Sequence, residues 1–184
     1  MERPSYGRVT LKPFEEELTP SEWQELYQCF RDPEIAEWNG ARPIKLPLWL
    51  FRRIVMADVK RGDRISFGIL EEHGEWIGSI ELYELRNNSA TLGIAIGKKE
   101  LWSHGYGTEA LIALLNYCFE TLKLERVQLR TFSHNLRAQK AFSKAGFRKV
   151  REEASSAGFV DLIMEVKAAE WQADPAPPTL HYDP

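Results

Sequence analysis

Apolar residues alternate with polar ones in some segments of the chain and recur every three or four residues in others. Alternation predicts strands, and the longer period predicts helices. Strands are predicted at Val9–Phe14, Arg64–Glu71, Glu75–Leu85, Ala90–Ile96, Arg126–Thr131, Phe147–Glu153 and Phe159–Lys167. Helices are predicted from Pro20 to about Phe30, Pro33 to about Trp38 and Pro47 to about Lys60, then after Gly107, and from Asn135 to Lys144. The order β-α-α-α-β-β-β-α-β-α-β-β indicates one α/β (α+β) domain.

Local signals indicate where several of these elements begin and end. Thr19, Pro20 and Glu22 form a capping-box start for the first helix, and Asp32-Pro33-Glu34 begins the second helix in the same way. Turn residues indicate tight connections between neighbouring strands at His73-Gly74, Asn87-Asn88 and Ser156–Gly158.

The stretch from Lys98 to Phe119 organises the chain, because it joins a strand to a helix through a loop with Gly105 and Gly107. The helix carries a buried stripe at three-and-four spacing, formed by Leu111, Leu114, Leu115, Cys118 and Leu122. Glycines let a backbone approach a ligand closely, and the first amides of a helix have no partners within it. The loop is therefore a candidate site for a phosphate or pyrophosphate.

Several interpretations of this glycine loop compete. It could simply start a helix, since Gly-x-Gly alone is weak evidence. A nucleotide P-loop is excluded, because no Gly-Lys-Ser/Thr follows the glycines. Gly105, Gly107 and Ala110 do satisfy the dinucleotide pattern G-x-G-x-x-A, but that pattern needs an acid near the end of the next strand. That strand ends Arg130-Thr131-Phe132, with no acid.

A second motif, N-L-R-A-Q-K-A-F-S-K-A-G-F, runs from Asn135 to Phe147. Together with W-S-H-G-Y-G-T-E-A-L from Trp102, in this order and at this separation, it resembles the GNAT superfamily of acetyl-CoA-dependent N-acetyltransferases. The similarity is closer to the branch that acetylates ribosomal-protein N-termini and spermidine, and it runs from about Val9 to Lys167. It implies a curved, mostly antiparallel mixed sheet, with helices on both faces and a splayed centre that admits the pantetheine arm.

The resemblance also implies which residues bind acetyl-CoA. The thioester oxygen would meet the main chain of Ile94, Ala95 and Ile96. The pyrophosphate would meet the loop residues Trp102, His104, Gly105, Tyr106, Gly107 and Thr108. Trp102 replaces the Gln or Arg usual in the family, which removes a side-chain donor but leaves the amides. The remaining candidates lie on the later motif: Asn135 for the coenzyme arm, Arg137 and Lys140 for the adenosine phosphates, and Phe142. Asn135 is also expected to be the N-cap of its helix.

The catalytic residues are where the sequence departs from the family pattern. Many relatives carry Tyr at the position of Phe142 and others Ser at that of Ala138, so the usual proton donor for the thiolate is missing. Substitutes remain at Tyr106, Ser133, His134 and Ser143, and His134 is the most titratable of them. Glu81, followed by Glu84, is the candidate base, although alternation alone does not say which face of the sheet it occupies. Water relayed by backbone carbonyls is the alternative.

Composition and charge restrict the kinds of partner that the protein is expected to bind. The 184 residues are 43% hydrophobic and 28% charged, with a net charge of −3, as expected for a single globular domain. Residues 14–38 carry eight acids and one base, whereas residues 98–151 carry eleven bases and four acids. This asymmetry suits a polyanionic coenzyme on one half and a cationic acceptor on the other. Nucleic acid is not an expected partner, because the basic half lacks interleaved aromatics.

The remaining expectations concern organisation and location. The domain is expected to span residues 1–167, followed by a proline-rich tail at 168–184. Cys29 and Cys118 read as reduced core residues, and no metal site is expected. Without a leader or a spanning apolar run, the expected location is cytoplasmic, without membrane association, and the state is monomer or homodimer.

We therefore expect acetyl transfer from acetyl-CoA to a primary amine by direct attack in a ternary complex. The amine would be a protein N-terminal α-amine, a polyamine or another small amine. At pH 7, removing a proton from a lysine-like amine costs about 4.6 kcal/mol, against about 1–1.4 kcal/mol for an α-amine. The first alternative is a catalytically silent acyl-CoA-binding regulatory module. A weaker alternative is dinucleotide binding.

Overall fold

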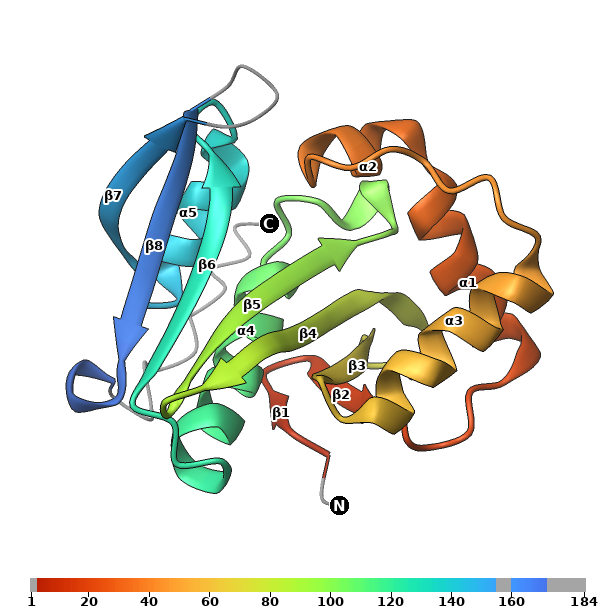
Figure 1. The fold of residues 1–184 in the computed structure, drawn as a ribbon, viewed down its shortest axis with the longest axis horizontal. Helices are drawn as coiled ribbons and strands as arrows, with labels where there is room; N and C mark the ends of the chain where they lie inside the picture. Colours follow the sequence, from red (N-terminus) through yellow and green to blue (C-terminus); the bar gives the residue numbers. More distant parts are fainter. Residues whose placement is uncertain (1–2, 155–159, 172–184) are drawn as a thin grey trace, which may run out of the picture.

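The computed structural model describes residues 3–154 and 160–171, and these build one eight-stranded sheet (Figure 1). The strands are β1 (Ser5–Tyr6), β2 (Val9–Pro13), β3 (Arg64–Leu70), β4 (Trp76–Arg86), β5 (Ser89–Ile96), β6 (Arg126–Phe132), β7 (Arg148–Ala154) and β8 (Val160–Lys167). They are arranged in the order β1-β2-β3-β4-β5-β6-β8-β7. Only β5 and β6 are parallel, so the predicted mixed, mostly antiparallel sheet is confirmed.

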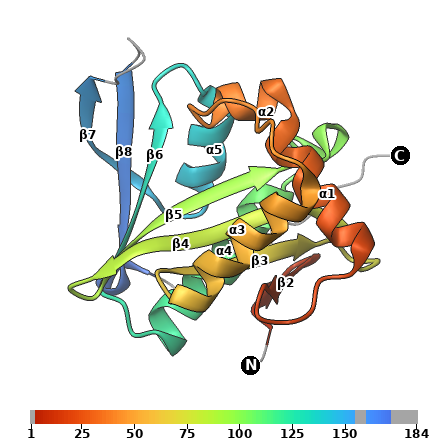
Figure 2. The ribbon, with the colours of Figure 1, turned by 45° about the vertical axis from the view of Figure 1, so that its right-hand side comes forward.

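Helices cover both faces of this sheet, as predicted (Figure 2). Their bounds are α1 (Pro20–Arg31), α2 (Pro33–Trp38), α3 (Leu48–Arg61), α4 (Tyr106–Asn116) and α5 (Leu136–Lys144), with a π-helical turn η2 (Tyr117–Thr121) continuing α4. Short 3₁₀ turns are η1 (Lys99–Leu101) and η3 (Ala168–Glu170). One core packs the sheet against α4 and α5, and a second core packs it against α1 and α3.

The predicted helix starts are present in detail. The Glu22 amide donates to Thr19 Oγ1 at 3.2 Å, and the Thr19 amide donates back to the Glu22 carboxylate at 2.7 Å. Asp32 accepts hydrogen bonds from the amides of Glu34 and Ile35. These capping interactions fix the entry of α1 and α2, and replacing such caps costs about 0.5–2 kcal/mol.

Helix α4 is buried more completely than a single stripe predicts. Leu111, Leu114 and Leu115 are fully buried, and Ala110 and Ala113 are buried as well. The reason is tertiary: α4 packs against the sheet, α5 and the hairpin of β1 and β2. Sequence periodicity does not register the hairpin, because β1 contains only two residues.

The packed chain continues past Lys167. Trp171 donates its indole N–H to Asn116 Oδ1 at 3.0 Å, and its ring packs on Phe119. The boundary at residue 167 stays a prediction, and both the turn at Ser156–Gly158 and residues 172–184 lie outside the described residues. None of the helices in residues 3–154 and 160–171 has the length and apolar composition that crossing a bilayer requires.

The centre of the sheet is split. Strands β5 and β6 pair only from Ser89 to Leu92, opposite Arg126 to Leu129. Beyond this point β5 stays with β4 up to Ile96, whereas β6 stays with β8 up to Phe132. The two strands therefore diverge, as Figure 1 shows, and they leave backbone groups without partners in the sheet. We call the point after Leu92 and Leu129 the apex of the splay.

Candidate active site

The glycine loop places a helix N-terminus at the open end of the splay. Gly105 is the N-cap of α4 with φ of +94°, a left-handed conformation that favours glycine. The first regular bond of the helix runs from the Glu109 amide to the Gly105 carbonyl at 3.0 Å. No side chain caps this end among the described residues, so the amides from Gly105 to Thr108 are available to an anion.

An ion pair that the sequence did not suggest holds this loop. Arg8, which follows β1, pairs with Glu109 in the first turn of α4, at 2.5 Å. The Arg8 amide also donates to Glu109 Oε2 at 2.7 Å, and its guanidinium donates to the His104 carbonyl at 2.8 Å. The Glu109 carboxylate raises the pKa of Arg8 above its usual value. Glu109 is buried, so this clamp fixes the loop from a residue 101 positions away.

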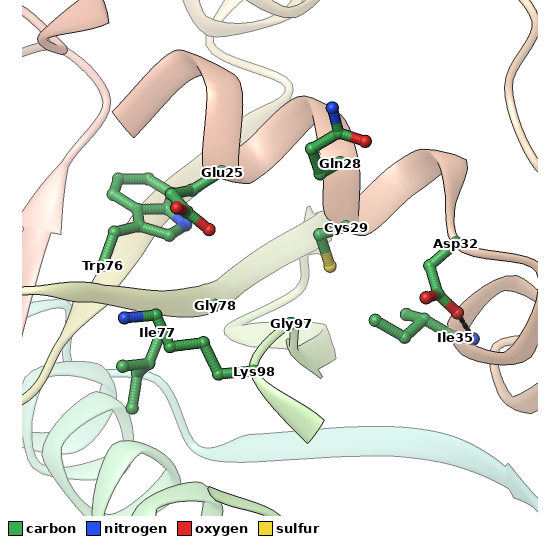
Figure 3. A pocket seen from close by; sticks show the side chains of 10 residues that line it. All are labelled: Glu25, Gln28, Cys29, Asp32, Ile35, Trp76, Ile77, Gly78, Gly97 and Lys98. Atoms are coloured by element: carbon green, nitrogen blue, oxygen red, sulfur yellow. Dashed lines mark hydrogen bonds between the residues drawn. The ribbon is translucent and has the colours of Figure 1, made fainter. Parts of the chain in front are cut away.

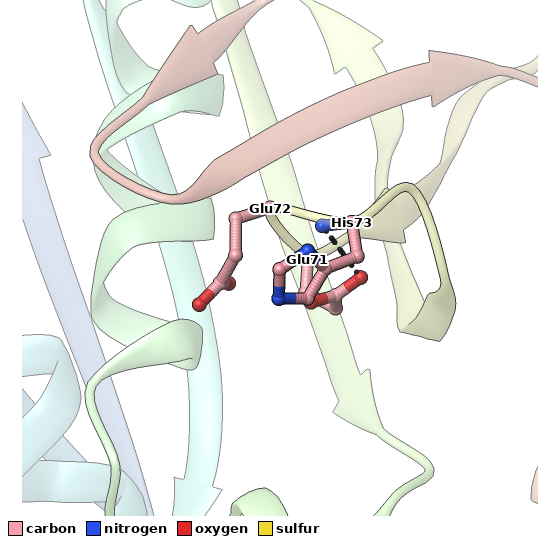
Figure 4. Close-up of side chains that lie close together, drawn as sticks. All are labelled: Glu71, Glu72 and His73. Atoms are coloured by element: carbon pink, nitrogen blue, oxygen red, sulfur yellow. Dashed lines mark hydrogen bonds between the residues drawn. The ribbon is translucent and has the colours of Figure 1, made fainter.

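Tyr106 is directed away from the splay. Its hydroxyl donates to the Glu72 carboxylate at 3.0 Å, on the turn between β3 and β4. Glu72 lies beside Glu71 and His73, and the His73 amide donates to Glu71 (Figure 4). The ligand atoms of these three residues lie within 4.8 Å of one another, but their hydrogen bonds already account for them as parts of an exposed turn. Tyr106 is therefore a structural anchor of the loop.

Backbone geometry directs two residues of β5 into the splay. The Gly97 amide donates to the Ile77 carbonyl at 2.8 Å, which sets the alternation of the β4–β5 ladder. In an antiparallel ladder every second residue points its amide and carbonyl away from the partner strand. Ile94 and Ile96 are those residues here, so their backbone groups face the gap. The Ile96 carbonyl is occupied, because Trp102 donates its indole N–H to it at 2.8 Å.

An arginine lies between two tryptophans at the mouth of the splay. The Arg137 guanidinium is 3.6 Å from the ring centroid of Trp102 and 5.6 Å from that of Trp38. The first tryptophan belongs to the glycine loop and the second ends α2, so Arg137 connects three segments that are distant in sequence. Desolvation lowers the pKa of Arg137. Within residues 3–154 and 160–171 no carboxylate lies within ion-pair distance of it, so its charge can serve an incoming anion.

The predicted residues on α5 divide into two groups. Asn135 is buried and caps the helix by accepting from the Ala138 amide at 3.2 Å, which confirms its expected capping role. Phe142 is buried in the core against Phe147, whereas Lys140 is exposed. Phe142 therefore presents no group to the splay, while Asn135 and Arg137 lie at its rim.

Glu81 lies at the apex of the splay. Its neighbours Ile80 and Leu82 pack in the core with α4, so Glu81 occupies the opposite face of the sheet. It pairs across the strands with Gly93, the first residue of β5 beyond the last β5–β6 pair. Arg64 on β3 donates to Glu81 Oε1 at 2.8 Å.

His134 is not a neighbour of Glu81. It lies in the turn after β6, and the strand from Leu129 to Phe132 alone spans about 10 Å at about 3.3 Å per residue. Its ring stacks on Phe132 at 5.2 Å and lies 5.7 Å from Trp38. The two predicted catalytic side chains thus occupy the apex and the mouth of the splay, and their roles stay predictions.

A cavity of about 100 Å³ lies between α1 and the strands, beside the end of β5 (Figure 3). Its polar lining includes Glu25, Gln28 and Asp32 from the acidic segment. Cys29 faces it too, and burial, followed by Asp32, raises the pKa of its thiol to about 11. Trp76 Nε1 is the one buried side-chain polar atom without a partner in the part of the chain that the structure describes.

The acidic and basic halves of the chain meet near this cavity. Lys99 in η1 pairs with Asp32 at 2.9 Å and with Glu34 at 2.7 Å, and Lys98 pairs with Glu75. These two lysines are therefore already neutralised by carboxylates. Arg137 is the better placed cation for an anionic ligand, because it has no such partner among the described residues.

Sequence comparison assigns the class of this fold and site. The profile described as "Acetyltransferase (GNAT) domain" matches residues 8–148, most of the chain. The chain therefore belongs to the GNAT acetyltransferase family, and the predicted family is confirmed.

Individual relatives agree with this assignment. "Uncharacterized N-acetyltransferase YoaA" of Bacillus subtilis (strain 168) is 25% identical over 140 residues, which cover 72% of this chain and 77% of that protein. The spermidine N-acetyltransferase of Vibrio cholerae, solved with CoA and spermine, superimposes with a TM-score of 0.78 at 16% identity, covering 89% and 97%. A GNAT-family acetyltransferase of Bacillus anthracis gives 0.76 at 14% identity, covering 92% and 100%. At these identities the two structures show the shared fold.

Proposed function

We propose that this protein transfers an acetyl group from acetyl-CoA to a primary amine. The observation that carries the proposal is the position of the α4 N-terminus, which no described side chain caps, beside a splay into which β5 directs backbone groups of Ile94 and Ile96. One feature offers amides to phosphates, and the other offers amides to an extended arm and its carbonyl. A thioester attached to a pyrophosphate needs both, in this order along its length.

Specific residues would hold the coenzyme. The amides from Gly105 to Thr108 suit its pyrophosphate, and Arg137, which pairs with no carboxylate of the described residues, suits a further phosphate. The pantetheine arm would lie along β5, with the Ile94 amide as donor to the developing oxyanion. Trp102 already occupies the Ile96 carbonyl, so it limits where the arm can pair with the strand.

The chemistry proposed is direct attack by an uncharged amine on the thioester carbonyl. Cys118 is fully buried in the core beside α4, and burial raises the pKa of its thiol, which disfavours an acetyl-cysteine intermediate. We assign Glu81 the role of taking the amine proton, because it lies at the apex opposite Gly93. An α-amine, which costs about 1–1.4 kcal/mol to deprotonate at pH 7, needs less help than a polyamine at about 4.6 kcal/mol. Both acceptor classes fit the proposal.

A silent acyl-CoA-binding module is the second candidate. The observation that favours it is the apolar character of α5 at the positions where relatives carry a proton donor, since Phe142 is buried in the core and Ala138 has only a methyl group. This candidate predicts coenzyme binding without turnover, whereas the leading proposal predicts both.

Thiol release from acetyl-CoA against an acceptor panel separates the two candidates. The panel contains spermidine, an aminoglycoside, free amino acids and short peptides beginning with Ala, Ser or Met, and coenzyme binding is measured in the same samples. We expect saturable binding and release with at least one acceptor class. Binding without release on any amine supports the silent module. Absence of binding at high micromolar coenzyme contradicts both.

A further inference from the structure

Three side chains meet on the sheet face opposite α4, at the apex of the splay. Arg64 and Tyr83 are direct cross-strand partners on β3 and β4, and Glu81 lies two residues before Tyr83 on the same face. Arg64 donates to Glu81 at 2.8 Å, and its guanidinium lies 5.3 Å from the Tyr83 ring centroid. Arg64 therefore holds the carboxylate and the phenol side by side.

Gly93 leaves an opening between the carboxylate and the phenol. A Cβ on Gly93 would lie 3.5 Å from Glu81 Oε1 and 3.5 Å from Tyr83 Cε1. The carboxylate and the phenol therefore converge on the space that a side chain at position 93 would fill. This space lies at the strand position where β5 separates from β6. Ile94, with its amide directed into the splay, is the next residue.

Tyr83 is placed by a local irregularity of β4. The β4–β5 register shifts immediately after Tyr83, and Glu84 adopts a left-handed φ of +53°. Such bulges re-aim side chains and are frequent near active sites. The Tyr83 ring lies against Gly93 of β5, because a Cβ on Gly93 would be 3.5 Å from Tyr83 Cε1.

The ionisation state of Tyr83 suits a proton donor. Burial, followed by the Glu81 and Glu84 carboxylates, raises the pKa of Tyr83 above its usual value. The phenol is therefore protonated at neutral pH, when a leaving thiolate would need a proton. Tyr106 cannot supply it, because its hydroxyl is bound to Glu72.

We propose that Glu81 and Tyr83 form the proton relay of this transferase, with Arg64 as a positioning residue, and this inference rests on the proposed function. The amine nitrogen bonds to the thioester carbon and gives its proton to the Glu81 carboxylate. The C–S bond then breaks, and the leaving sulfur takes the proton of the Tyr83 hydroxyl. The protonated Glu81 returns a proton to the Tyr83 phenolate. The net products are the amide and the free thiol, and both side chains regain their starting states.

The relay comes from the face opposite the family's usual donor. In this chain the two α5 positions of the family's usual donors hold Phe142, which is buried, and Ala138, so neither position carries a hydroxyl. The phenol of Tyr83 on β4 lies at the apex on the opposite face of the sheet. The inference thus explains how a chain without the usual tyrosine or serine can still protonate its leaving group.

Tyr83→Phe tests the relay, because it removes one hydroxyl and keeps the ring that packs near Arg64. We expect kcat to fall about 100-fold, the lower range for a general acid, with the acetyl-CoA dissociation constant unchanged. Glu81→Gln should cost a similar factor. The double variant should be no slower than the slower single variant, since groups that act as one unit are non-additive. Tyr117→Phe, at a buried tyrosine beyond α4 that packs on Phe67, is the matched control and should retain full kcat.

A fluorinated tyrosine at position 83 gives a second readout that a merely structural role would not move. Its more acidic phenol should shift the alkaline limb of the kcat–pH profile to lower pH. An active wild type together with an unchanged kcat in Tyr83→Phe overturns the relay but leaves the proposed function standing. A wild type without activity, whether or not it binds coenzyme, overturns the proposed function itself. Failure of the relay and failure of the proposed function are therefore distinguishable.

Discussion

The candidate sites at the two ends of the splay are formed by different kinds of groups. At the mouth, the candidate phosphate site consists of backbone amides at a left-handed glycine, held by one distant ion pair. At the apex, the proposed proton relay consists of side chains from neighbouring strands, held by one another. A site formed by backbone amides can be predicted from a sequence motif, because glycines and helix starts are visible in sequence. A site formed by side chains from several strands has no such motif, because its residues are ordinary strand residues that only the strand register brings together.

The strongest test of this contrast is to fill the glycine cradle. A valine at Gly105 would force a β-branched residue to φ of +94° and bring its Cβ to about 3.1 Å from Arg8 Nη2. Left-handed backbone costs roughly 1–2 kcal/mol per residue, and the amides would be displaced. We expect Gly105→Val to weaken acetyl-CoA binding about 100-fold, which corresponds to about 2.7 kcal/mol, measured by calorimetry. Gly74→Val, at φ of +81° in an open turn, carries the same strain and should bind normally.

Releasing the clamp on the loop should have a smaller effect. Glu109→Gln leaves Arg8 with a neutral partner at a buried position, and hydrogen bonds to charged groups contribute about 1.5–3 kcal/mol. We expect the free energy of unfolding to fall by about 2 kcal/mol and coenzyme affinity to fall about tenfold, by urea titration and calorimetry. Glu16→Gln breaks the exposed pair with Arg3 and should change neither by more than a few tenths of a kcal/mol. Equal losses in both variants would contradict the clamp.

Arg137 is a second candidate phosphate contact at the mouth of the splay, and its loss should have a smaller effect than the loss of the clamp. Arg137→Met removes the charge between Trp38 and Trp102, and we expect about fivefold weaker coenzyme binding with a shallower dependence on salt, as for loss of one phosphate contact. Lys144→Met removes a charge from the exposed part of the same helix and serves as the control. If the two variants bind coenzyme equally well, Arg137 contacts no phosphate and only connects the segments that carry Trp38 and Trp102.

The last prediction concerns an effect confined to alkaline pH, at Cys29 in the cavity between α1 and the strands. Burial raises the pKa of Cys29 in the folded protein from 9.0 to about 11. Between these values the folded thiol holds its proton while the unfolded thiol loses it, so the stability contributed by this difference is complete below pH 9 and is lost as pH rises toward 11. We expect Cys29→Ala to flatten the decline of the free energy of unfolding over this window. An identical decline in both proteins would contradict this assignment.

The sequence predicted the fold well because its signals are local. The capping box at Thr19, the cap at Asp32 and the alternation of β4 and β5 all act within a few residues, and each is present in the structure. The resemblance carried by the two motifs supplied the splay. The features that the sequence did not predict lack a local signal. The Arg8–Glu109 pair spans 101 positions, and β1 is too short to show a period.

The catalytic candidates illustrate the same limit. Alternation alone does not give the sheet face of Glu81, whereas strand pairing puts it at the apex, opposite Gly93. The titratable ring makes His134 a candidate in sequence, whereas the fold puts it at the mouth beside Trp38. Tyr83 and Arg64 gave no sequence signal, because their proximity follows from the register of β3 and β4. Side-chain placement across strands depends on pairing, which a single sequence does not specify.

A crystal structure of the full chain with acetyl-CoA tests the central claim most directly. We predict pyrophosphate oxygens within hydrogen-bond distance of the amides from Gly105 to Thr108. We also predict the thioester carbonyl on the Ile94 amide and the sulfur at the apex, between Glu81 and Tyr83. A coenzyme bound outside the splay, or a splay closed by pairing of β5 with β6 beyond Leu92, would contradict the account.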